Sequence, residues 1–283
     1  MLKPFFEGWY YKQQAGGTTL AVIPGRSSGG AFIQVITDKE SFNIPFALPE
    51  YRKDRILQMA GNEFSNSGIK LNVKRNGISL YGELRYSNLT PLKGDVMGPF
   101  RYFPMECRHG ILSMKHNVSG EMILNGEKLN FDNGTGYIET DSGHSFPEDY
   151  SWIQSNDFQE NCSVMASVAK IPFAGLHFWG CICIVWLNGK QYRLATYKGA
   201  KIHRCGLGVM ELEQGKYRFA ATVNQGNALG LAAPVSGSMD RMIRESASCP
   251  AAFEFTENGK ALFAGESKRA SYEFMMANAI NLY

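Results

Sequence analysis

The sequence lacks most of the patterns that identify common protein classes on their own. No basic cluster is longer than Lys74-Arg75 or Lys268-Arg269, and the formal net charge is only +3, so nucleic acid is not an expected partner. No apolar run approaches the roughly 18 residues of a membrane span, and none of signal-peptide length precedes Glu7. We therefore expect a cytoplasmic protein.

Metal and nucleotide motifs are missing as well. The six cysteines include no Cys-x-x-Cys, and the five histidines have no zinc-type spacing, which predicts reduced, mostly buried thiols and no metal site. A phosphate-binding Gly-x-x-x-x-Gly-Lys and a complete dinucleotide-type Gly-x-Gly-x-x-Gly are also absent. Kinase and dehydrogenase functions are therefore not indicated.

The sequence is rich in apolar residues and in turn signals. Its 283 residues are 44% apolar, which is enough to fill a large core. Asn-Gly, which suits the positive backbone angles of two-residue hairpin turns, occurs five times: Asn76-Gly77, Asn125-Gly126, Asn133-Gly134, Asn188-Gly189 and Asn258-Gly259. Around the first pair, apolar and polar residues alternate over residues 69–80, as in a hairpin with one exposed face. These signals predict an antiparallel all-β protein with little helix.

Two further segments bear on the architecture. Residues 181–186 are apolar on both faces and precede a tight turn. This pattern fits a strand in the wall of a barrel or sandwich that has a ligand cavity or a packed interior on one side. It fits a central strand of a sandwich without a cavity equally well. Residues 239–247 fit either helix or strand, and we favour strand. A Gly-rich turn near the midpoint suggests two β-rich domains, residues 1–133 and 134–283.

One stretch combines many acids with many aromatics. Residues 136–158 read GYIETDSGHSFPEDYSWIQSNDF, and glycine and proline interrupt any regular periodicity. If this stretch begins as a strand, Tyr137 and Glu139 share a face, and the turn that follows brings His144 and Trp152 over the same site. Gln154 lies two residues further on.

The acids in this stretch are candidate catalytic groups. A carboxyl group surrounded by apolar side chains stays protonated at neutral pH because burial penalises its charged form, so it can act as a general acid. Glu139 is the first candidate and Asp141 the second. Two structural alternatives stay open: Glu139 pairs with an arginine such as Arg108 and fastens the two domains together, and Asp141 forms an Asx-type turn cap before Gly143.

Other candidate binding residues lie elsewhere in the chain. Trp9 and Tyr11 share one face of the first predicted strand, where they either line a pocket or belong to the core. Glu106 and Arg108 point the same way and either polarise a substrate or lie at a solvated edge. An exposed patch of Trp9, Tyr10 and Tyr11 would instead indicate an interaction module.

The stretch at 136–158 resembles the central signature of the tocopherol cyclase family. There a Gly-Tyr-x-Glu strand is followed by an acidic turn, Phe-Pro and Trp-x-Gln. FFEGWYYKQQ at 5–14, FPMECRHGILSMKH at 103–116 and YRLATYKGAKI at 192–202 agree with the family in the same order. One departure is Ser142, which stands where many members carry a tryptophan.

The resemblance implies a fold and a chemistry. The fold is two packed lipocalin-like antiparallel β-barrel or sandwich domains, distantly similar to carotenoid hydratases and pericyclase-type enzymes, with a pocket for an apolar small molecule. Reactions of the tocopherol cyclase type protonate a trisubstituted double bond of an isoprenoid tail, and a phenol oxygen captures the carbocation. No metal, nucleotide or redox cofactor is needed.

Together, the residues and the resemblance define one expectation and its alternative. We expect a hydrophobic small-molecule partner of the isoprenoid or prenylated phenol type and acid-assisted ring closure at Glu139 or Asp141. A non-catalytic lipocalin-like carrier fits the same sequence, and transient contact with a membrane surface is left open. The candidate substrate-binding residues are Trp9, Tyr11, Glu106, Arg108, Tyr137, His144, Trp152 and Gln154.

Overall fold

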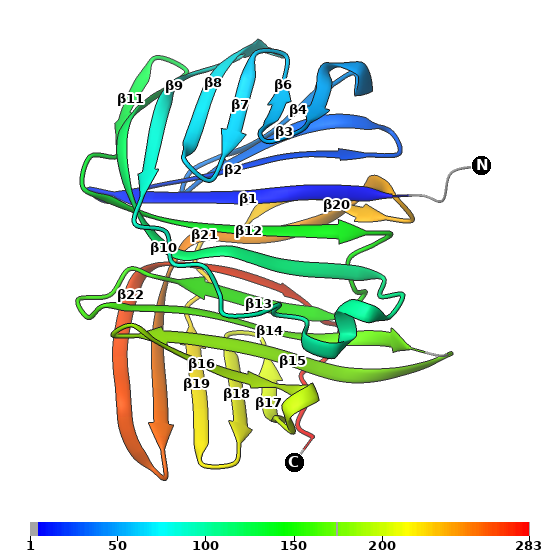
Figure 1. Ribbon diagram of the computed structural model, residues 1–283, viewed down its shortest axis with the longest axis vertical. Coiled ribbons are helices and arrows are strands. Elements are labelled where there is room, and N and C mark those ends of the chain that lie inside the picture. Colours follow the sequence, from blue (N-terminus) through cyan, green and yellow to red (C-terminus); the bar gives the residue numbers. More distant parts are fainter. Residues whose placement is uncertain (1–4, 174, 283) are drawn as a thin grey trace. The chain divides into compact units, whose positions relative to one another are not determined.

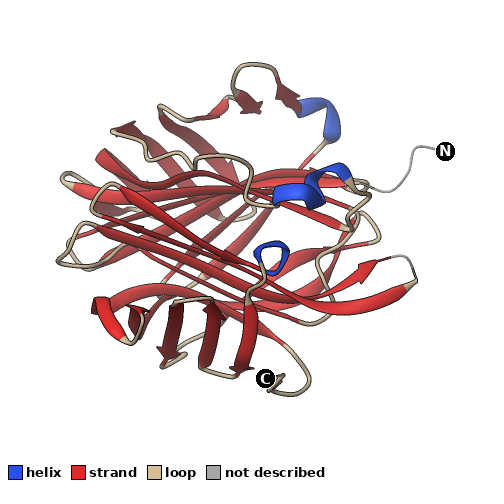
Figure 2. Ribbon diagram, turned by 60° about the horizontal axis from the view of Figure 1, so that its bottom comes forward, coloured by secondary structure: helices blue, strands red, loops and turns tan. Residues whose placement is uncertain are grey.

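The computed structural model describes residues 5–173 and 175–282. These residues fold almost wholly into antiparallel strands, and Figure 2 shows only short helical segments beside them. The helical segments are three 3-10 turns: η1 (Leu48–Glu50), η2 (Gly98–Tyr102) and η3 (Thr196–Lys198). The expectation of an all-β protein with little helix is confirmed. None of the helices among the described residues is long and apolar enough to cross a membrane.

The strands of the described residues form two sheets (Figure 1). The first sheet has the order β4-β3-β2-β1-β12-β10-β9-β8-β7-β6-β5, with β11 paired to β10. Its strands are β1 (Phe6–Ala15), β2 (Thr18–Ser27), β3 (Gly30–Thr37), β4 (Ser41–Phe46), β5 (Tyr51–Lys53), β6 (Leu57–Met59), β7 (Asn62–Ser65), β8 (Gly68–Arg75), β9 (Ile78–Ser87), β10 (Cys107–Leu124), β11 (Glu127–Asn130) and β12 (Gly134–Gly143).

The second sheet has the order β16-β15-β14-β13-β22-β21-β19-β18-β17, with β20 paired to β21. Its strands are β13 (Tyr150–Ser155), β14 (Cys162–Phe173), β15 (Leu176–Leu187), β16 (Lys190–Ala195), β17 (Lys201–Gly206), β18 (Val209–Gln214), β19 (Tyr217–Val223), β20 (Leu229–Val235), β21 (Ser238–Glu257) and β22 (Lys260–Met275). Residues 239–247 lie within β21, so the strand favoured for that segment is confirmed. Within the described ranges neither sheet closes into a barrel, because the terminal strands in each order are not paired with one another.

The chain divides into two compact units. The first comprises Met1–Pro91, His109–Ser145 and Leu231–Arg241, and the second comprises Leu92–Arg108, Phe146–Gly230 and Met242–Tyr283. This division differs from the single boundary expected after residue 133. Strand β12 belongs with the first unit because it pairs with β1 along nine residue positions.

Asn-Gly turns account for much of the hairpin geometry. Four of the five pairs close two-residue turns, between β8 and β9, β10 and β11, β15 and β16, and β21 and β22. In each the asparagine has a positive φ angle between 48° and 53°, which asparagine tolerates better than most residues. The fifth pair, Asn133-Gly134, leads from β11 into β12 instead, and these two strands do not pair.

Each unit has its own hydrophobic core. In the first, the inward residues of β8 are Ile69, Leu71 and Val73, and the residues between them face solvent, as the alternation predicts. In the second, Cys181 and Cys183 of β15 lie in the core, while Ile184 is buried on the opposite face. The strand is thus buried on both sides as expected. All six cysteines are free thiols, and five of them are buried.

Candidate functional site

The candidate site lies on the face of the first sheet that is turned away from the core of its own unit. On β12, Ile138 belongs to the core and pairs with the core residue Tyr11 of β1. Because side chains alternate along a strand, Tyr137, Glu139 and Asp141 point to the other face. Tyr137 and Glu139 are buried there, with 0% and 5% of their surface exposed. The prediction that Tyr137 and Glu139 share a face is confirmed.

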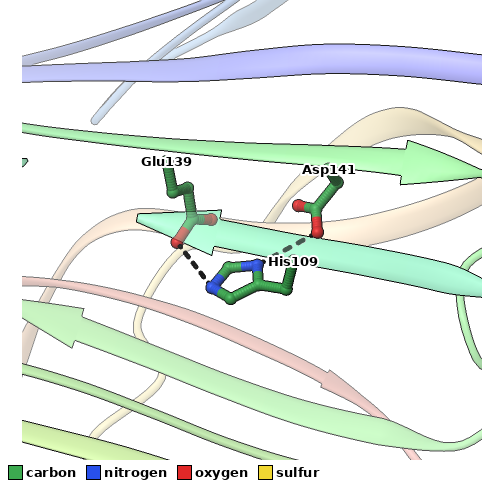
Figure 3. A group of neighbouring side chains, drawn as sticks. All are labelled: His109, Glu139 and Asp141. Carbon is green, nitrogen blue, oxygen red and sulfur yellow. Dashed lines mark hydrogen bonds and ion pairs between the residues drawn. The ribbon is translucent and has the colours of Figure 1, made fainter. Parts of the chain in front are cut away.

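A histidine from the neighbouring strand joins the two acids. His109 lies on β10, and Figure 3 shows its ring between the two carboxyl groups, with one nitrogen directed at each. The distance from His109 Nδ1 to Asp141 Oδ1 is 3.0 Å, and that from His109 Nε2 to Glu139 Oε2 is 3.6 Å. The first is a hydrogen bond, whereas the second is an ion-pair distance slightly longer than a hydrogen bond.

The two acids determine the charge of this histidine. Burial by itself would lower the pKa of His109, but the charges of Asp141 and Glu139 and the hydrogen bond with Asp141 outweigh it and raise the pKa to about 9. His109 is therefore an imidazolium at neutral pH. With both carboxyl groups ionised, the three side chains carry a net charge of −1.

Tyr137 completes the cluster from the same strand as Glu139. Its hydroxyl group donates a hydrogen bond of 2.6 Å to Glu139 Oε2, the oxygen that also faces His109. Burial, followed by the charge of Glu139 and this hydrogen bond, raises the pKa of Tyr137 well above its ordinary value. Tyr137 therefore stays protonated and acts as a donor, which fixes the orientation of the Glu139 carboxylate.

The same three side chains have the donor types of a metal site. One ligand atom each from His109, Glu139 and Asp141 can be chosen so that all three lie within 4.8 Å of one another. Imidazole and carboxylate are ligands of zinc and other divalent transition metals. In the observed arrangement, however, the two ring nitrogens face different carboxylates, so a metal on one nitrogen would have to displace one of these contacts. The geometry fits a hydrogen-bonded chain better than a closed ligand set.

The sequence alone does not predict the role of His109. The five histidines lack a metal spacing, and each fits a structural residue on sequence grounds. The available signal is the alternation in residues 106–109, which places His109 on the face opposite Arg108. The alternative in which Glu139 pairs with Arg108 is not found: Arg108 is exposed and forms no ion pair with any described residue, whereas His109 lies beside Glu139.

Other candidate residues lie apart from this cluster. Tyr11 belongs to the core of the first unit and Trp9 packs against that core, on the face of the sheet opposite Glu139. Tyr10 and Tyr11 are only 7% and 3% exposed, so the exposed aromatic patch of an interaction module is not present there. Whether Trp9 or Tyr11 contacts a ligand stays a prediction.

The remaining candidates are distributed over both units. Glu106 is half-buried just before β10, in the second unit. His144 follows β12 in the first unit, and its backbone carbonyl accepts a hydrogen bond from Gly237. Trp152 and Gln154 lie on β13 of the second unit, buried on the face opposite the core residue Ile153. Their roles in ligand binding stay predictions.

A second polar cluster surrounds Glu7 at the start of β1. Its buried carboxylate accepts hydrogen bonds from Arg26 Nε at 2.7 Å, from the Tyr51 hydroxyl at 2.8 Å and from Lys53 Nζ at 2.8 Å. Lys53 also lies over the ring of Trp9, with its Nζ 4.3 Å from the ring centroid. Both carboxylate oxygens are engaged by these donors, so the cluster ties β5 to the start of β1 and is structural.

One sequence match to a hydrolase motif has a structural explanation. Residues 25–29 read GRSSG, which fits the Gly-x-Ser-x-Gly pattern of a nucleophile elbow. That motif requires a turn from a strand into a helix, whereas this segment closes the hairpin between β2 and β3, with Ser27 paired to Gly30. The Ser27 hydroxyl accepts a hydrogen bond from the backbone of Gly29. It is a turn residue rather than a nucleophile.

The family relationship rests on the greater part of the chain. The profile of the tocopherol cyclase-like family matches residues 84–274. The chain belongs to this family. The match includes β10 and β12, and therefore all four members of the Tyr137–Glu139–His109–Asp141 cluster. No curated protein matches the chain.

Solved structures with low sequence identity share the fold. The structure of CghA has a TM-score of 0.61 and 9% identity, with 96% of this chain and 88% of that chain covered. Kievitone hydratase from Nectria haematococca has a TM-score of 0.55 and 12% identity, with 97% and 89% covered. A protein described as AttH from Nitrosomonas europaea has a TM-score of 0.55 and 12% identity, with 97% and 93% covered. The resemblance to a two-domain lipocalin-like fold is thereby confirmed.

Proposed function

We propose that this tocopherol cyclase-like protein binds an isoprenoid or prenylated phenol and closes a ring by acid catalysis at Glu139. The observation that carries the proposal is the position of His109, whose two nitrogens face two different carboxyl groups. This chain of side chains places an imidazolium beside the buried acid Glu139, to which it can give its Nε2 proton while Asp141 holds the proton on Nδ1.

The proton balance of ring closure suits such a chain. Protonation of the substrate double bond by Glu139 forms a C–H bond and leaves a tertiary carbocation. The phenol oxygen then forms a C–O bond to that carbon and releases its proton, which the bare Nε2 of His109 accepts. His109 is thereby an imidazolium again and can pass its Nε2 proton to Glu139 for the next turnover, while Asp141 holds the proton on Nδ1 throughout. The product is an isomer of the substrate, and no proton is consumed.

The burial of Glu139 supports the protonated state that this step needs. Separated charges are costly away from water, so proton transfer from the imidazolium to Glu139 yields a neutral pair that competes with the ion pair. The gap of 3.6 Å between His109 Nε2 and Glu139 Oε2 has to shorten by a few tenths of an ångström for that transfer. Catalytic hydrogen bonds commonly tighten when substrate binds.

The charge of the cluster also supports the proposal. The cluster carries a net charge of −1 before Glu139 gives up its proton and −2 afterwards, and this negative charge favours a carbocation nearby. The aromatic face of Tyr137 adds a further favourable contact of about 0.5 to 2 kcal/mol when a cation lies above it. One structural neighbour is named as a hydratase, and hydration likewise adds an oxygen nucleophile across a double bond. The same acid would serve addition of water or of an internal phenol.

Turnover of a prenylated hydroquinone by three variants tests the proposal. We expect Glu139→Gln to lose at least about 100-fold in kcat, because general acid catalysis typically contributes this much or more. His109→Gln and Asp141→Asn should slow regeneration of the acid and shift the pH profile. The matched control is Glu121→Gln, a half-exposed acid at the far end of β10. Unchanged turnover in Glu139→Gln would rule out this acid, and tight binding without turnover in the unaltered protein would favour the carrier function.

A further inference from the structure

The β14–β15 hairpin extends past the sheet to which it belongs. The two strands pair with each other from one end to the other, but β13 pairs only with Val164–Ala169 and β16 only with Ile182–Leu187. The end of the hairpin therefore continues as a two-stranded ribbon, and Figure 1 shows it reaching beyond β13. This ribbon packs against η2, since the ring of its Phe178 lies 5.8 Å from that of Phe100.

The end of this ribbon and the neighbouring η2 turn expose large apolar side chains. Leu176 is 76% exposed, Tyr102 74%, Phe103 42% and Phe173 36%. The rings of Phe103 and Phe173 lie 5.6 Å apart, and Leu176 is the cross-strand partner of Phe173. Phe100 of η2 also contacts this group, with its ring centroid 6.3 Å from that of Phe173. We call this surface the tip patch: Phe100, Tyr102, Phe103, Phe173 and Leu176.

The charged residues of the segments that form the tip patch are basic. Residues 97–105 and 170–180 contain Arg101, Lys170 and His177 but no aspartate or glutamate, and the nearest acid along the chain whose charge acts on Arg101 is Asp95. The guanidinium of Arg101 lies 4.5 Å above the ring of Tyr102. Lys170 has Asp149 as an ion-pair partner at 3.6 Å, and Arg101 remains a basic group within the patch itself. Aromatic and apolar side chains beside basic ones are the composition that binds an anionic lipid surface.

Two observations favour lipid over a second copy of the chain. Pairing of two tip patches would bring the basic groups of both copies together, whereas an anionic bilayer attracts them. Beneath the patch, Phe100 and Ile171 also line a cavity of about 60 Å³ whose other walls include Met97, Phe178 and Tyr197. A cavity of this size has room for a few carbon atoms, such as the end of an acyl chain.

We propose that the tip patch inserts into the interfacial region of an anionic lipid bilayer. Tyr102 and Phe103 lie at headgroup depth, Phe173 and Leu176 reach the acyl boundary, and Arg101 contacts lipid phosphate. The proposal stands on this surface alone and does not depend on the chemistry proposed at Glu139. If both hold, docking brings the protein to the phase in which an isoprenoid substrate partitions.

Sedimentation with lipid vesicles tests the proposal. The full-length protein is mixed with vesicles of phosphatidylcholine, alone or with one third phosphatidylglycerol, and the bound fraction is measured against lipid concentration. We expect binding to the anionic vesicles, weakened at least about tenfold by the double substitution Phe173→Ser and Leu176→Ser. The matched control is Leu207→Ser, since Leu207 is 64% exposed at another hairpin turn of the same unit. This control should bind like the unaltered protein.

A second variant separates the role of charge from the role of apolar contact. Arg101 is exposed, so Arg101→Gln leaves the fold intact. It should weaken binding to the anionic vesicles about fivefold and leave the weaker binding to pure phosphatidylcholine unchanged. The proposal is overturned if the unaltered protein binds neither vesicle, or if the double variant binds as well as the unaltered protein. A dimer in light scattering that the double variant dissociates, without vesicle binding, would assign the patch to self-association instead.

Discussion

Replacing His109 by glutamine should remove a pH-dependent part of the stability. Burial by itself lowers the pKa of His109, but the charges of Asp141 and Glu139 raise it from 6.5 to about 9. This difference corresponds to about 3 kcal/mol of preferential interaction with the imidazolium form. Because the pKa is raised in the folded state, the contribution is fully present below the unfolded value of 6.5 and is lost as the pH rises through about 9.

The assay is urea denaturation over a pH series. Between about pH 6 and about pH 10 the free energy of unfolding of the unaltered protein should fall by about 3 kcal/mol more than that of His109→Gln, because other titrating groups are common to both and cancel. NMR titration of the His109 ring in the folded protein gives an independent value. Asp141→Asn should move that titration midpoint back toward the ordinary range. Parallel stability curves, or a midpoint at or below 6.5, would refute the assigned ion pairs.

Two further predictions concern the first unit. Glu7→Gln should lower the free energy of unfolding, measured in urea, by about 2 kcal/mol, because it removes the charge-assisted hydrogen bonds from Arg26 and Lys53. The loss is limited because these two cationic side chains are 41% and 43% exposed and are partly rehydrated in the variant. Burial by itself would raise the pKa of Glu7, but the hydrogen bonds from Lys53 and Tyr51 and the charges of Lys53 and Arg26 together outweigh it and lower the pKa. This contribution is therefore present at neutral pH and is lost as the pH falls. Equal stability of Glu7→Gln and the unaltered protein would contradict the structural role. Gly136→Ala should lower the free energy of unfolding by about 1 to 3 kcal/mol, because the new Cβ would lie 2.2 Å from His116 Nε2. In the control Gly8→Ala the new Cβ meets nothing closer than 3.8 Å, so the stability should change little. Thermal denaturation distinguishes the two variants, and similar melting temperatures would show that the His116 side chain moves aside without cost.

Local signals in the sequence were sufficient for the fold class. Asparagine and glycine adopt positive φ angles readily, so Asn76-Gly77 specifies a tight turn wherever its strands lie. The alternation of Ile69, Leu71 and Val73 likewise depends only on the period of a strand. These features require no knowledge of distant pairing, and the structure contains them as predicted.

Non-local pairing explains what the sequence could not supply. His109 and Glu139 are 30 residues apart and meet only because β10 and β12 become neighbours in the sheet. Alternation along the strand shows that the side chains of Trp9 and Tyr11 lie on the same face of the sheet. Which face this is follows only from the pairing of Tyr11 with Ile138, which places them on the core face, opposite the side chain of Glu139. Likewise, nothing local to residues 231–241 indicates that they group with the first unit, where Gln34 exchanges hydrogen bonds with the backbone of Ala232.

The central claim is that Glu139 delivers a proton to an alkene, and deuterium reports it directly. The purified protein is incubated with a prenylated hydroquinone in heavy water, and the recovered molecule is analysed by mass spectrometry, with Glu139→Gln in parallel. The account predicts a cyclised isomer that carries one deuterium on the carbon next to the new ether carbon, formed by the unaltered protein and not by Glu139→Gln. Recovery of bound, unchanged substrate without deuterium would contradict it and identify a carrier.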